Sequence, residues 1–458
     1  MIHSSILLQH IYCLMTDSDR PTRTDVDLLI EGNKVKAIGP TGTIRPVEPC
    51  RIIDCSHHVV IPGFVNTHHH FYQTLTRNLP AVQDAELFDW LRYLYNIWKH
   101  LDEEAVYVSS MLAMAELLKT GCTCTTDHHY LYPSGFTSDL MGCQFEAADR
   151  VGMRFSPTRG SMSLSQKDGG LPPDSVVQTA DQILADSERV IHTYHDPDGM
   201  AMHKIVLAPC SPFSVTKELM KESAALARRH GVRLHTHLAE TRDENQFCIE
   251  MYKKRPLALM EECDLIGEDV FYAHGIHFND DELRLLAESQ THIAHCPSSN
   301  MRLGSGICRV SEMLRMGINV GIAVDGSASN DSSDMLQELR TTLLLQRVQQ
   351  GANAITARQV FKMATHNGAK LLNFSKVGIL QEGWAADIAI FDMNHIGYAG
   401  AQSDPIASLI FCGYDHQASY TIVNGNIVVD NKRLVGINEE SLALIACRSS
   451  DRLLAKAR

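Results

Sequence analysis

Three consecutive histidines, His68, His69 and His70, follow an apolar run in the segment 61–80, IPGFVNTHHHFYQTLTRNLP. Side chains on a β-strand alternate between its two faces. Two histidines on one face can chelate a divalent cation, whereas a single histidine cannot. We therefore expect His68 and His70 to be metal ligands and His69 to point to the opposite side. The alternative, a surface or tag-like run, fits poorly with the PGFV sequence at the end of a predicted strand.

The segment LHTHLAET offers a third histidine ligand. His235 and His237 share one face of the predicted strand, and His237 is nearer to its end. We expect His237 to bind the metal and interpret His235 as a packed core residue. Glu240, three residues further on, is placed to move protons beside the metal. Asp325 in VDGSASND can supply a carboxylate ligand, although an aspartate before glycine is more often a turn former. Three imidazoles and one carboxylate suit zinc or iron(II), with a water completing the shell.

Further histidines lie at the ends of other predicted strands. His274 can orient the water or stabilise a developing oxyanion, or it can be a buried, hydrogen-bonded residue. His295 fits a substrate contact and a structural role equally well. His128 and His129 lack metal-ligand spacing, and we interpret them as residues that support the ligands or line the substrate site.

The segment 71–98 is long and rich in aromatic residues, which can cover a flat heterocycle by stacking. Gln73 offers both a hydrogen-bond donor and an acceptor, as a purine edge requires. Arg77, Tyr130 and Tyr132 are further candidates for substrate contact. For any one aromatic residue in this part of the chain, packing of the loop onto the core is the commoner role.

Eight apolar, β-type runs alternate with helical patterns through the middle of the chain. The runs span residues 61–70, 122–130, 154–160, 204–212, 233–240, 270–276, 291–297 and 319–326. This alternation predicts an α/β fold, a (β/α)8 TIM-type barrel, in which functional residues collect at the C-terminal ends of the strands. The polar residues that end most of the runs agree with that rule. An open doubly wound sheet is the competing fold, but no glycine-rich phosphate loop follows the first run.

The two ends of the chain consist of short β-type runs joined by turns. EGNK (31–34) and NGN (424–426) are hairpin signals between such runs. We expect residues 1–60 and 376–458 to form a small β-sandwich, the second segment adding a C-terminal helix, around a metal-dependent barrel of residues 61–375.

The 458 residues carry a net charge of −13 and are 44% hydrophobic. The acidic balance argues against a nucleic-acid partner and fits action on a small molecule. No apolar run approaches the roughly 18–20 residues of a membrane span, and the N-terminus lacks the features of a secretion signal. Thirteen scattered cysteines without paired spacing are expected to be reduced thiols, so we expect a cytoplasmic protein.

The segments PGFVNTHHH, HTHLAE, YAHGIHF, HCPSSN and AVDGSASND occur in this order, and VNGNIVVD lies near the C-terminus. Over nearly the whole chain, this combination resembles the amidohydrolase superfamily. Binuclear members carry a carboxylated lysine at the end of strand four, sometimes strand three. Here strand four ends in APCSP with Lys204 at its other end, and strand three ends in Arg159. The resemblance therefore implies the mononuclear branch, with one divalent metal per chain, zinc before iron(II), and a homo-oligomer, a dimer or larger.

Within that branch, NTHHHFYQTLTRNLPAVQDAELFDWLRYLYNIW, TTDHHYLYP and CPSSNMRLGSGI look most like the 8-oxoguanine deaminases, with isoxanthopterin deaminases and hydroxydechloroatrazine ethylaminohydrolase-type enzymes close by. The resemblance implies hydrolysis of the 2-amino group of 8-oxoguanine to urate and ammonia, a step of purine catabolism. Isoxanthopterin, guanine, cytosine or a hydroxy-s-triazine is the alternative ring, and an alkylamine or chloride is the alternative leaving group. A non-catalytic barrel scaffold is the alternative from another class, but such scaffolds typically lose ligands that are all present here.

The expected roles of the acid and base groups complete this interpretation. Asp325 accepts the proton of the attacking water while it remains near the metal. Glu240 protonates a ring nitrogen of the substrate, and His274 helps to position the hydroxide. Asp325 or Glu240 then delivers a proton to the departing amine.

Overall fold

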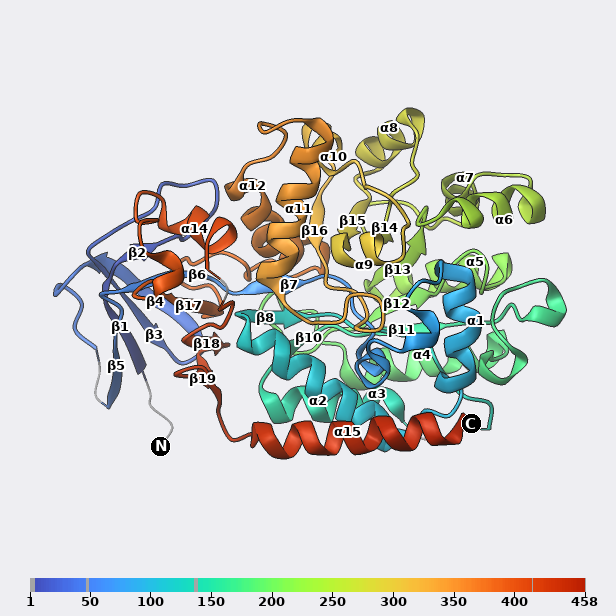
Figure 1. Cartoon of the computed structure of the whole chain (residues 1–458), viewed down its shortest axis with the longest axis horizontal. Coiled ribbons are helices and arrows are strands. Elements are labelled where there is room, and N and C mark those ends of the chain that lie inside the picture. Colours follow the sequence, from blue (N-terminus) through green and yellow to red (C-terminus); the bar gives the residue numbers. More distant parts are fainter. Residues whose placement is uncertain (1–4, 47–48, 136–138, 414, 458) are drawn as a thin grey trace.

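The computed structural model describes residues 5–46, 49–135, 139–413 and 415–457. An α/β barrel makes up most of the molecule, and two small β-sheets lie together at one end of it (Figure 1). The barrel strands point away from these sheets, so their C-terminal ends face the opposite side of the molecule. The predicted fold class, a (β/α)8 barrel with a small β-sandwich built from both chain ends, is confirmed.

Eight parallel strand positions follow one another around the barrel within the described residues, two of them interrupted. They are β7 (Phe64–Asn66), β8 (Cys122–Thr125) continued by β9 (His128–His129), β10 (Arg154–Phe155) continued by β11 (Thr158–Ser161), β12 (Val206–Pro209), β13 (Arg233–Leu238), β14 (Val270–His274), β15 (His292–His295) and β16 (Val320–Ile322). The first and last strands meet where the backbone N–H of Thr67 donates to the carbonyl of Ile322 at 3.0 Å. This hydrogen bond closes the barrel.

Capping residues set the ends of two long helices that the sequence pattern predicts. Asp102 accepts the backbone N–H of Ala105 at 2.9 Å at the start of α2 (Glu103–Lys119), and Gly121, with φ of +84°, follows its end. Asp334 caps α11 (Met335–Gln350) in the same way. None of the helices in the described ranges is both long and apolar enough to cross a membrane.

The remaining helices connect or cover the strands. They are α1 (Leu87–Trp98), α3 (Leu140–Val151), α4 (Ala180–Tyr194), α5 (Lys217–His230), α6 (Arg242–Tyr252), α7 (Pro256–Glu262), α8 (Asp280–Ser289), α9 (Pro297–Arg302), α10 (Val310–Arg315), α12 (Ala357–Lys362), α13 (Gly368–Leu371) and α14 (Pro405–Phe411), with the 3₁₀ turn η1 (Phe71–Thr76). Of these, α1 and η1 follow the first barrel strand and form one wall of the cavity described below.

The β-sandwich draws its strands from both ends of the chain. One sheet has the order β4-β3-β1-β5 and the other β2-β6-β17-β18-β19-β20. The strands are β1 (Ser5–Ile11), β2 (Cys13–Leu14), β3 (Val26–Glu31), β4 (Lys34–Pro40), β5 (Cys50–Asp54), β6 (His58–Pro62), β17 (Ile388–Asp392), β18 (Tyr420–Val423), β19 (Asn426–Asp430) and β20 (Arg433–Leu434). Leu28, Val60 and Ile388 belong to the apolar core between the sheets. Both predicted hairpins, β3–β4 and β18–β19, are present. The division of the chain at residues 60 and 375 stays a prediction.

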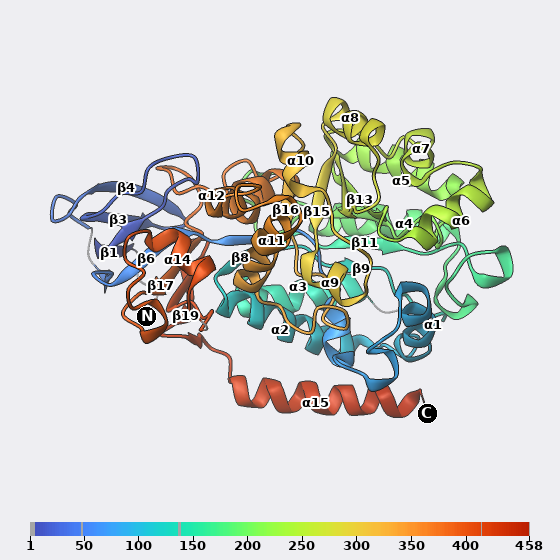
Figure 2. The same ribbon diagram turned by 45° about the horizontal axis from the view of Figure 1, so that its top comes forward.

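The C-terminal helix α15 (Glu439–Lys456) leaves the β-sandwich and runs along the barrel beside α2 (Figures 1 and 2). Its Ser450 hydroxyl donates to the carbonyl of Leu75 in η1 at 2.6 Å. Lys456 forms an ion pair with Asp102 at 2.8 Å. The last helix of the chain therefore supports the segment that follows the three histidines.

A buried ion pair joins the barrel to the β-sandwich. Arg154 on β10 donates through Nε and Nη2 to the two carboxylate oxygens of Asp387, each at 2.9 Å, and both side chains are at most 1% exposed. Asp387 also accepts the backbone N–H of Asn424 at 2.8 Å. A charge buried this deeply is tolerated only when it is paired and hydrogen-bonded.

Replacing Asp387 with alanine leaves the Arg154 charge buried without a counter-charge. We expect the free energy of unfolding to fall by about 3–5 kcal/mol, measured by urea denaturation followed by circular dichroism. The control is Asp89→Ala, which removes an exposed pair with Arg92 and should change stability by ~1 kcal/mol or less. Equal losses in the two variants would contradict a structural role for the buried pair.

Candidate metal centre and active site

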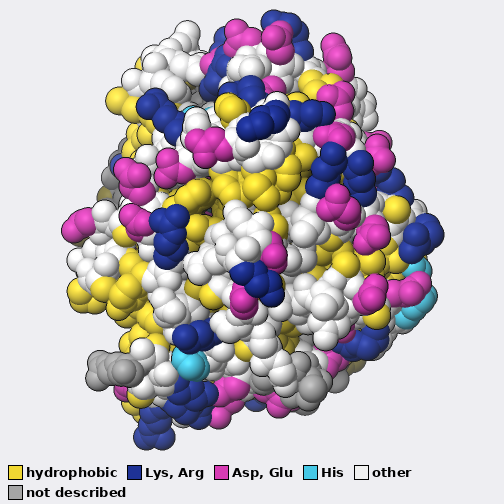
Figure 3. All heavy atoms as spheres, turned by 90° about the vertical axis from the view of Figure 1, so that its right-hand side faces the viewer, with side chains coloured by type: hydrophobic (Ala, Val, Ile, Leu, Met, Phe, Trp, Pro, Cys, Tyr) yellow, Lys and Arg dark blue, Asp and Glu magenta, His cyan; other side chains and the backbone are white. Residues whose placement is uncertain are grey.

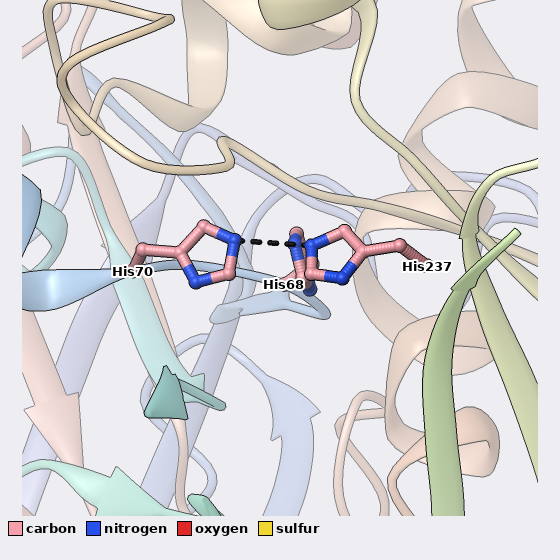
Figure 4. Close-up of side chains that lie close together, drawn as sticks. All are labelled: His68, His70 and His237. Atoms are coloured by element: carbon pink, nitrogen blue, oxygen red, sulfur yellow. Dashed lines mark hydrogen bonds between the residues drawn. The ribbon is translucent and has the colours of Figure 1, made fainter. Parts of the chain in front are cut away.

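The three histidines predicted to bind a metal come together at the C-terminal end of the barrel. His68 and His70 follow β7, and His237 lies on β13. Their ligand atoms all lie within 4.8 Å of one another, and Nε2 of His70 is 3.1 Å from Nε2 of His237 (Figure 4). All three side chains are buried. The histidines thus converge from two separate strands.

Hydrogen bonds set the protonation of two of these rings. Nδ1 of His70 lies 2.8 Å from the carbonyl of His128, and Nδ1 of His237 lies 2.8 Å from the carbonyl of Cys210. A carbonyl oxygen only accepts, so each Nδ1 carries the hydrogen and each Nε2 of the neutral ring presents a lone pair. Two lone pairs then face each other at 3.1 Å, an arrangement that a cation between them would stabilise.

A fourth histidine, His235, fixes the hydrogen of His68 on Nδ1. Nδ1 of His235 donates to the carbonyl of Phe271 at 2.9 Å, so its Nε2 is free to accept from Nδ1 of His68 at 2.8 Å. Nε2 of His68 is buried and lacks a hydrogen-bond partner among the described residues. His235 is buried, as a core residue would be, and it also orients a candidate ligand.

Asp325 completes the donor set from the end of β16. Its Oδ1 lies 3.4 Å from Nε2 of His68 and 3.5 Å from Nε2 of His70. A tetrahedral zinc ion with bonds of about 2.0–2.1 Å separates its ligand atoms by about 3.3 Å. The spacings of the pairs His70–His237, His68–Asp325 and His70–Asp325, 3.1–3.5 Å, are close to that value. The residues therefore suit a divalent metal.

His69 points away from the other two histidines. Its Nε2 is 3.0 Å from the hydroxyl of Ser333, and its ring packs edge-on against Phe71 with centroids 4.8 Å apart. Because β7 ends at Asn66, the three histidines lie just beyond the regular strand rather than on it. The alternation expected for a strand nevertheless holds for the three rings: His68 and His70 lie on one side of the chain and His69 on the other.

Two candidate proton-transfer groups lie beside the metal ligands. Oε2 of Glu240 is 3.4 Å from Nε2 of His274, and that nitrogen is 4.0 Å from Oδ2 of Asp325. Burial raises the pKa of Glu240 to about 7. Burial also opposes a charge on His274, but the nearby carboxylates of Glu240 and Asp325 outweigh it and raise the pKa of His274. Glu240 can therefore gain and lose a proton near neutral pH.

A buried hydrogen-bond network holds His274 in place. Its Nδ1 donates to Oδ1 of Asn300, on α9, at 2.8 Å. Glu338 accepts from the backbone N–H and the hydroxyl of Ser298 on the same helix, at 3.1 and 2.6 Å. Asn330, in the loop after β16, donates to Glu338 at 3.2 Å. One buried carboxyl thus connects the support of His274 to the loop that carries Asp325.

The metal ligands and acid groups open into a cavity with an apolar wall. Gln73 and Tyr130, both predicted to contact substrate, line this cavity, and Oε1 of Gln73 has no hydrogen-bond partner within the described chain. The other lining residues are His70, Leu87, Trp90, Leu91, Tyr95, Cys210, Phe213, His237, Glu240, His274, Leu303, Asp325 and Ser329. Hydrophobic side chains also gather in the middle of the molecular face toward which the strands point (Figure 3). A flat, partly polar molecule suits such a site.

Three residues predicted to contact substrate lie outside the cavity wall. The guanidinium of Arg77 forms a bidentate ion pair with Glu116 on α2. The ring of Tyr132 packs against the guanidinium of Arg159, 3.8 Å from the ring centroid. His295 is buried on β15 and is not part of the lining. None of these three side chains lines the cavity, and their contact with substrate stays a prediction.

Several residues of the site were not identified from the sequence. Asn300 holds His274, and Cys210, Phe213, Leu303 and Ser329 line the cavity. Three of the five, Cys210, Phe213 and Asn300, follow the end of a barrel strand within five residues. Applying the rule of C-terminal strand ends to every residue type, and not only to ionisable ones, would have found them.

Alanine at His68, His70 or His237 should abolish stoichiometric metal binding, because each removes one lone pair of the donor set. His69→Ala, the matched control, should keep the metal. His235→Phe removes only the acceptor for His68, and we expect ~10–100-fold weaker metal affinity. Metal content is measured by plasma mass spectrometry after dialysis, and affinity by competition with a chelator. Full metal content in the first three variants, or its loss in the His69 variant, would contradict this assignment.

Comparison with known proteins agrees with the fold and the site. The model of the amidohydrolase family matches residues 59–428. The chain is 47% identical over 399 residues to 8-oxoguanine deaminase from Pseudomonas aeruginosa, covering 87% of this chain and 88% of that protein. It is 36% identical over 433 residues to hydroxydechloroatrazine ethylaminohydrolase from a Pseudomonas species, covering 92% and 90%. The structure of atrazine chlorohydrolase TrzN from Arthrobacter aurescens complexed with zinc matches with a TM-score of 0.93 at 29% identity, covering 97% of this chain and 100% of that chain. The chain belongs to the amidohydrolase family, as its sequence motifs suggested.

Proposed function

We propose that this protein hydrolyses an amino group from a purine-like base, with 8-oxoguanine as the substrate and urate and ammonia as the products. The observation that carries the proposal is the 47% identity to an 8-oxoguanine deaminase over most of both chains. It is supported by a donor set and acid groups that are complete and mutually within reach. An assembly of two or more copies, the expected oligomeric state, is kept as part of this proposal.

We assign one divalent metal to the site, zinc in the first place and iron(II) as the alternative. His68, His70, His237 and Asp325 would hold it. The choice of a single metal follows from the residue after strand β12, where binuclear members carry a carboxylated lysine. Here that residue is Cys210, and Lys204 lies at the other end of the strand, where its Nζ donates to the carbonyl of Pro197 at 3.2 Å. The bound cation supplies Lewis acidity, which makes a neighbouring water nucleophilic near neutral pH.

The residues of the chain carry the protons of the reaction. Asp325 accepts a proton from the attacking water. Glu240 donates its proton to the ring nitrogen next to the amino-bearing carbon, which makes that carbon electrophilic. The water oxygen adds to the carbon with His274 beside it, and Glu240 takes back the hydroxyl proton of the adduct. Asp325 or the reprotonated Glu240 protonates the departing amine, the carbon–nitrogen bond breaks, and a carbonyl remains. The balance is one base and one water in, and out come one ammonia and one base that carries a carbonyl oxygen in place of the amino group.

Recognition of the ring is assigned to the opposite wall of the cavity. The amide of Gln73 can donate to one atom of a purine edge and accept from another. Trp90 and Leu91 from α1, with Phe213, offer apolar surface for the faces of a flat ring. Because these groups come from segments outside the metal site, they are where substrate preference would be set.

The proposal is tested by measuring kcat/KM for 8-oxoguanine, isoxanthopterin, guanine, cytosine and a hydroxy-s-triazine with the metal-loaded enzyme. We expect 8-oxoguanine to give the highest kcat/KM. Its turnover is monitored by the absorbance of urate and by the release of ammonia. The similarity to hydroxydechloroatrazine ethylaminohydrolase makes the hydroxy-s-triazine the second candidate. A clear preference for another ring would change the substrate and keep the reaction, whereas no turnover of any of them would overturn the function.

Glu240→Gln keeps the size of the side chain but cannot exchange a proton. We expect kcat for the best substrate to fall by about 10²–10⁴, because removal of a general acid typically costs that much. Bound metal should be unchanged. Glu250→Gln, an exposed position on the nearby helix α6, is the control and should keep full activity. Wild-type kcat in the Glu240 variant would remove this residue from the proton path.

A further inference from the structure

A second buried carboxylate lies four residues beyond Glu240 and stays outside the cavity wall. Glu244, in the first turn of α6, is fully buried. Its Oε1 accepts the backbone N–H of Ala239 and its Oε2 the backbone N–H of Glu240, both at 2.8 Å. We propose that Glu244 is a positioning residue, which fixes the turn that aims Glu240 at the substrate. The inference rests on the role of Glu240 in the proposed function.

The turn needs support because its backbone conformation is unfavourable. Ala239 has φ of +54°, in the left-handed region that residues other than glycine rarely adopt. It directly follows β13, which ends at Leu238, and it redirects the chain before Glu240. The N–H groups of Ala239 and Glu240 therefore leave the strand ladder, and buried N–H groups need a partner. Glu244 supplies one oxygen to each.

The same turn is hydrogen-bonded to the loop that follows His274, the residue beside Glu240. The carbonyl of Ala239 accepts from the backbone N–H groups of Ile276 and His277, each at 2.9 Å. These residues follow β14, which ends with His274. By holding Ala239, Glu244 sets the position of Glu240 relative to His274, whose Nε2 lies 3.4 Å from Oε2 of Glu240.

Glu244 is itself held by a rigid element. Thr241 is the N-cap of α6, and its hydroxyl accepts the backbone N–H of Glu244 at 3.2 Å. The helix start therefore presents the carboxylate to the turn from a fixed place. Since both oxygens of Glu244 are occupied by backbone N–H groups, its effect on the reaction passes through Glu240.

The test compares Glu244→Gln with Asp243→Asn in the metal-loaded enzyme. The amide nitrogen of the glutamine would face a backbone N–H, so the turn loses one hydrogen bond. Asp243 is the exposed neighbour on the same helix, and its replacement by asparagine also removes one carboxyl group. We expect Glu244→Gln to lower kcat by ~10–100-fold through misplacement of Glu240, with KM and bound metal unchanged. Asp243→Asn should leave kcat unchanged.

A double-mutant cycle separates positioning from a general loss of structure. In the Glu240→Gln background, Glu244→Gln should have no further effect on kcat, because the group it positions is already inactive. An equal loss of kcat in both backgrounds, or an equal loss in Asp243→Asn, would overturn the inference. Glu244→Asp keeps the charge but is one methylene shorter. It should give an intermediate kcat, and it replaces Glu244→Gln if that variant does not fold.

The outcome for Glu244 is distinguishable from the outcome for the proposed function. If Glu240→Gln keeps wild-type kcat, the role of Glu240 fails whatever Glu244 does. If Glu240→Gln is inactive and Glu244→Gln is fully active, only the present inference fails. If no ring is turned over, a crystal structure of Glu244→Gln decides: an unchanged left-handed Ala239 and an unmoved Glu240 would overturn the positioning role, and a displaced Glu240 would support it.

Discussion

The structure depends on the convergence of electron pairs that repel one another. Backbone carbonyls and His235 hold the hydrogens of His68, His70 and His237 on Nδ1, so three Nε2 lone pairs and the carboxylate of Asp325 crowd together. Neighbouring ligand atoms among them lie as close as 3.1–3.5 Å. A bound cation would relieve this repulsion. Without a cation, the repulsion lowers the free energy of unfolding. The closed barrel is what keeps these groups from moving apart.

Strain at the strand ends serves the same purpose. Ala239, His274 and Asp325 all have φ between +54° and +72°, although none is glycine. Each of them follows or ends a barrel strand at the point where a functional side chain must turn toward the centre. Such conformations persist only where the surroundings over-determine them. Glu244 and the network around Glu338 provide that constraint from the starts of helices that follow the strands.

The cavity has a polar base and an apolar wall, and the two come from different parts of the chain. The base is formed by residues at the barrel strand ends, whereas much of the wall comes from α1 and the segment before it. That segment is in turn held by α15, through Ser450 and Leu75. The four candidate metal ligands and the α1 part of the wall therefore lie on separate segments of the chain.

The sequence alone determined the barrel, the β-sandwich hairpins, and the grouping of His68, His70, His237, Glu240 and Asp325. These features follow from local periodicity and from the rule that strand ends of a barrel share one side, so short segments are sufficient to predict them. Only the tertiary structure decided the rest: that His235 orients His68, that Asn300 holds His274, and that Arg77 pairs with Glu116. Each of those contacts joins residues 26 to 167 positions apart, and the choice of partner depends on distances that no local pattern contains.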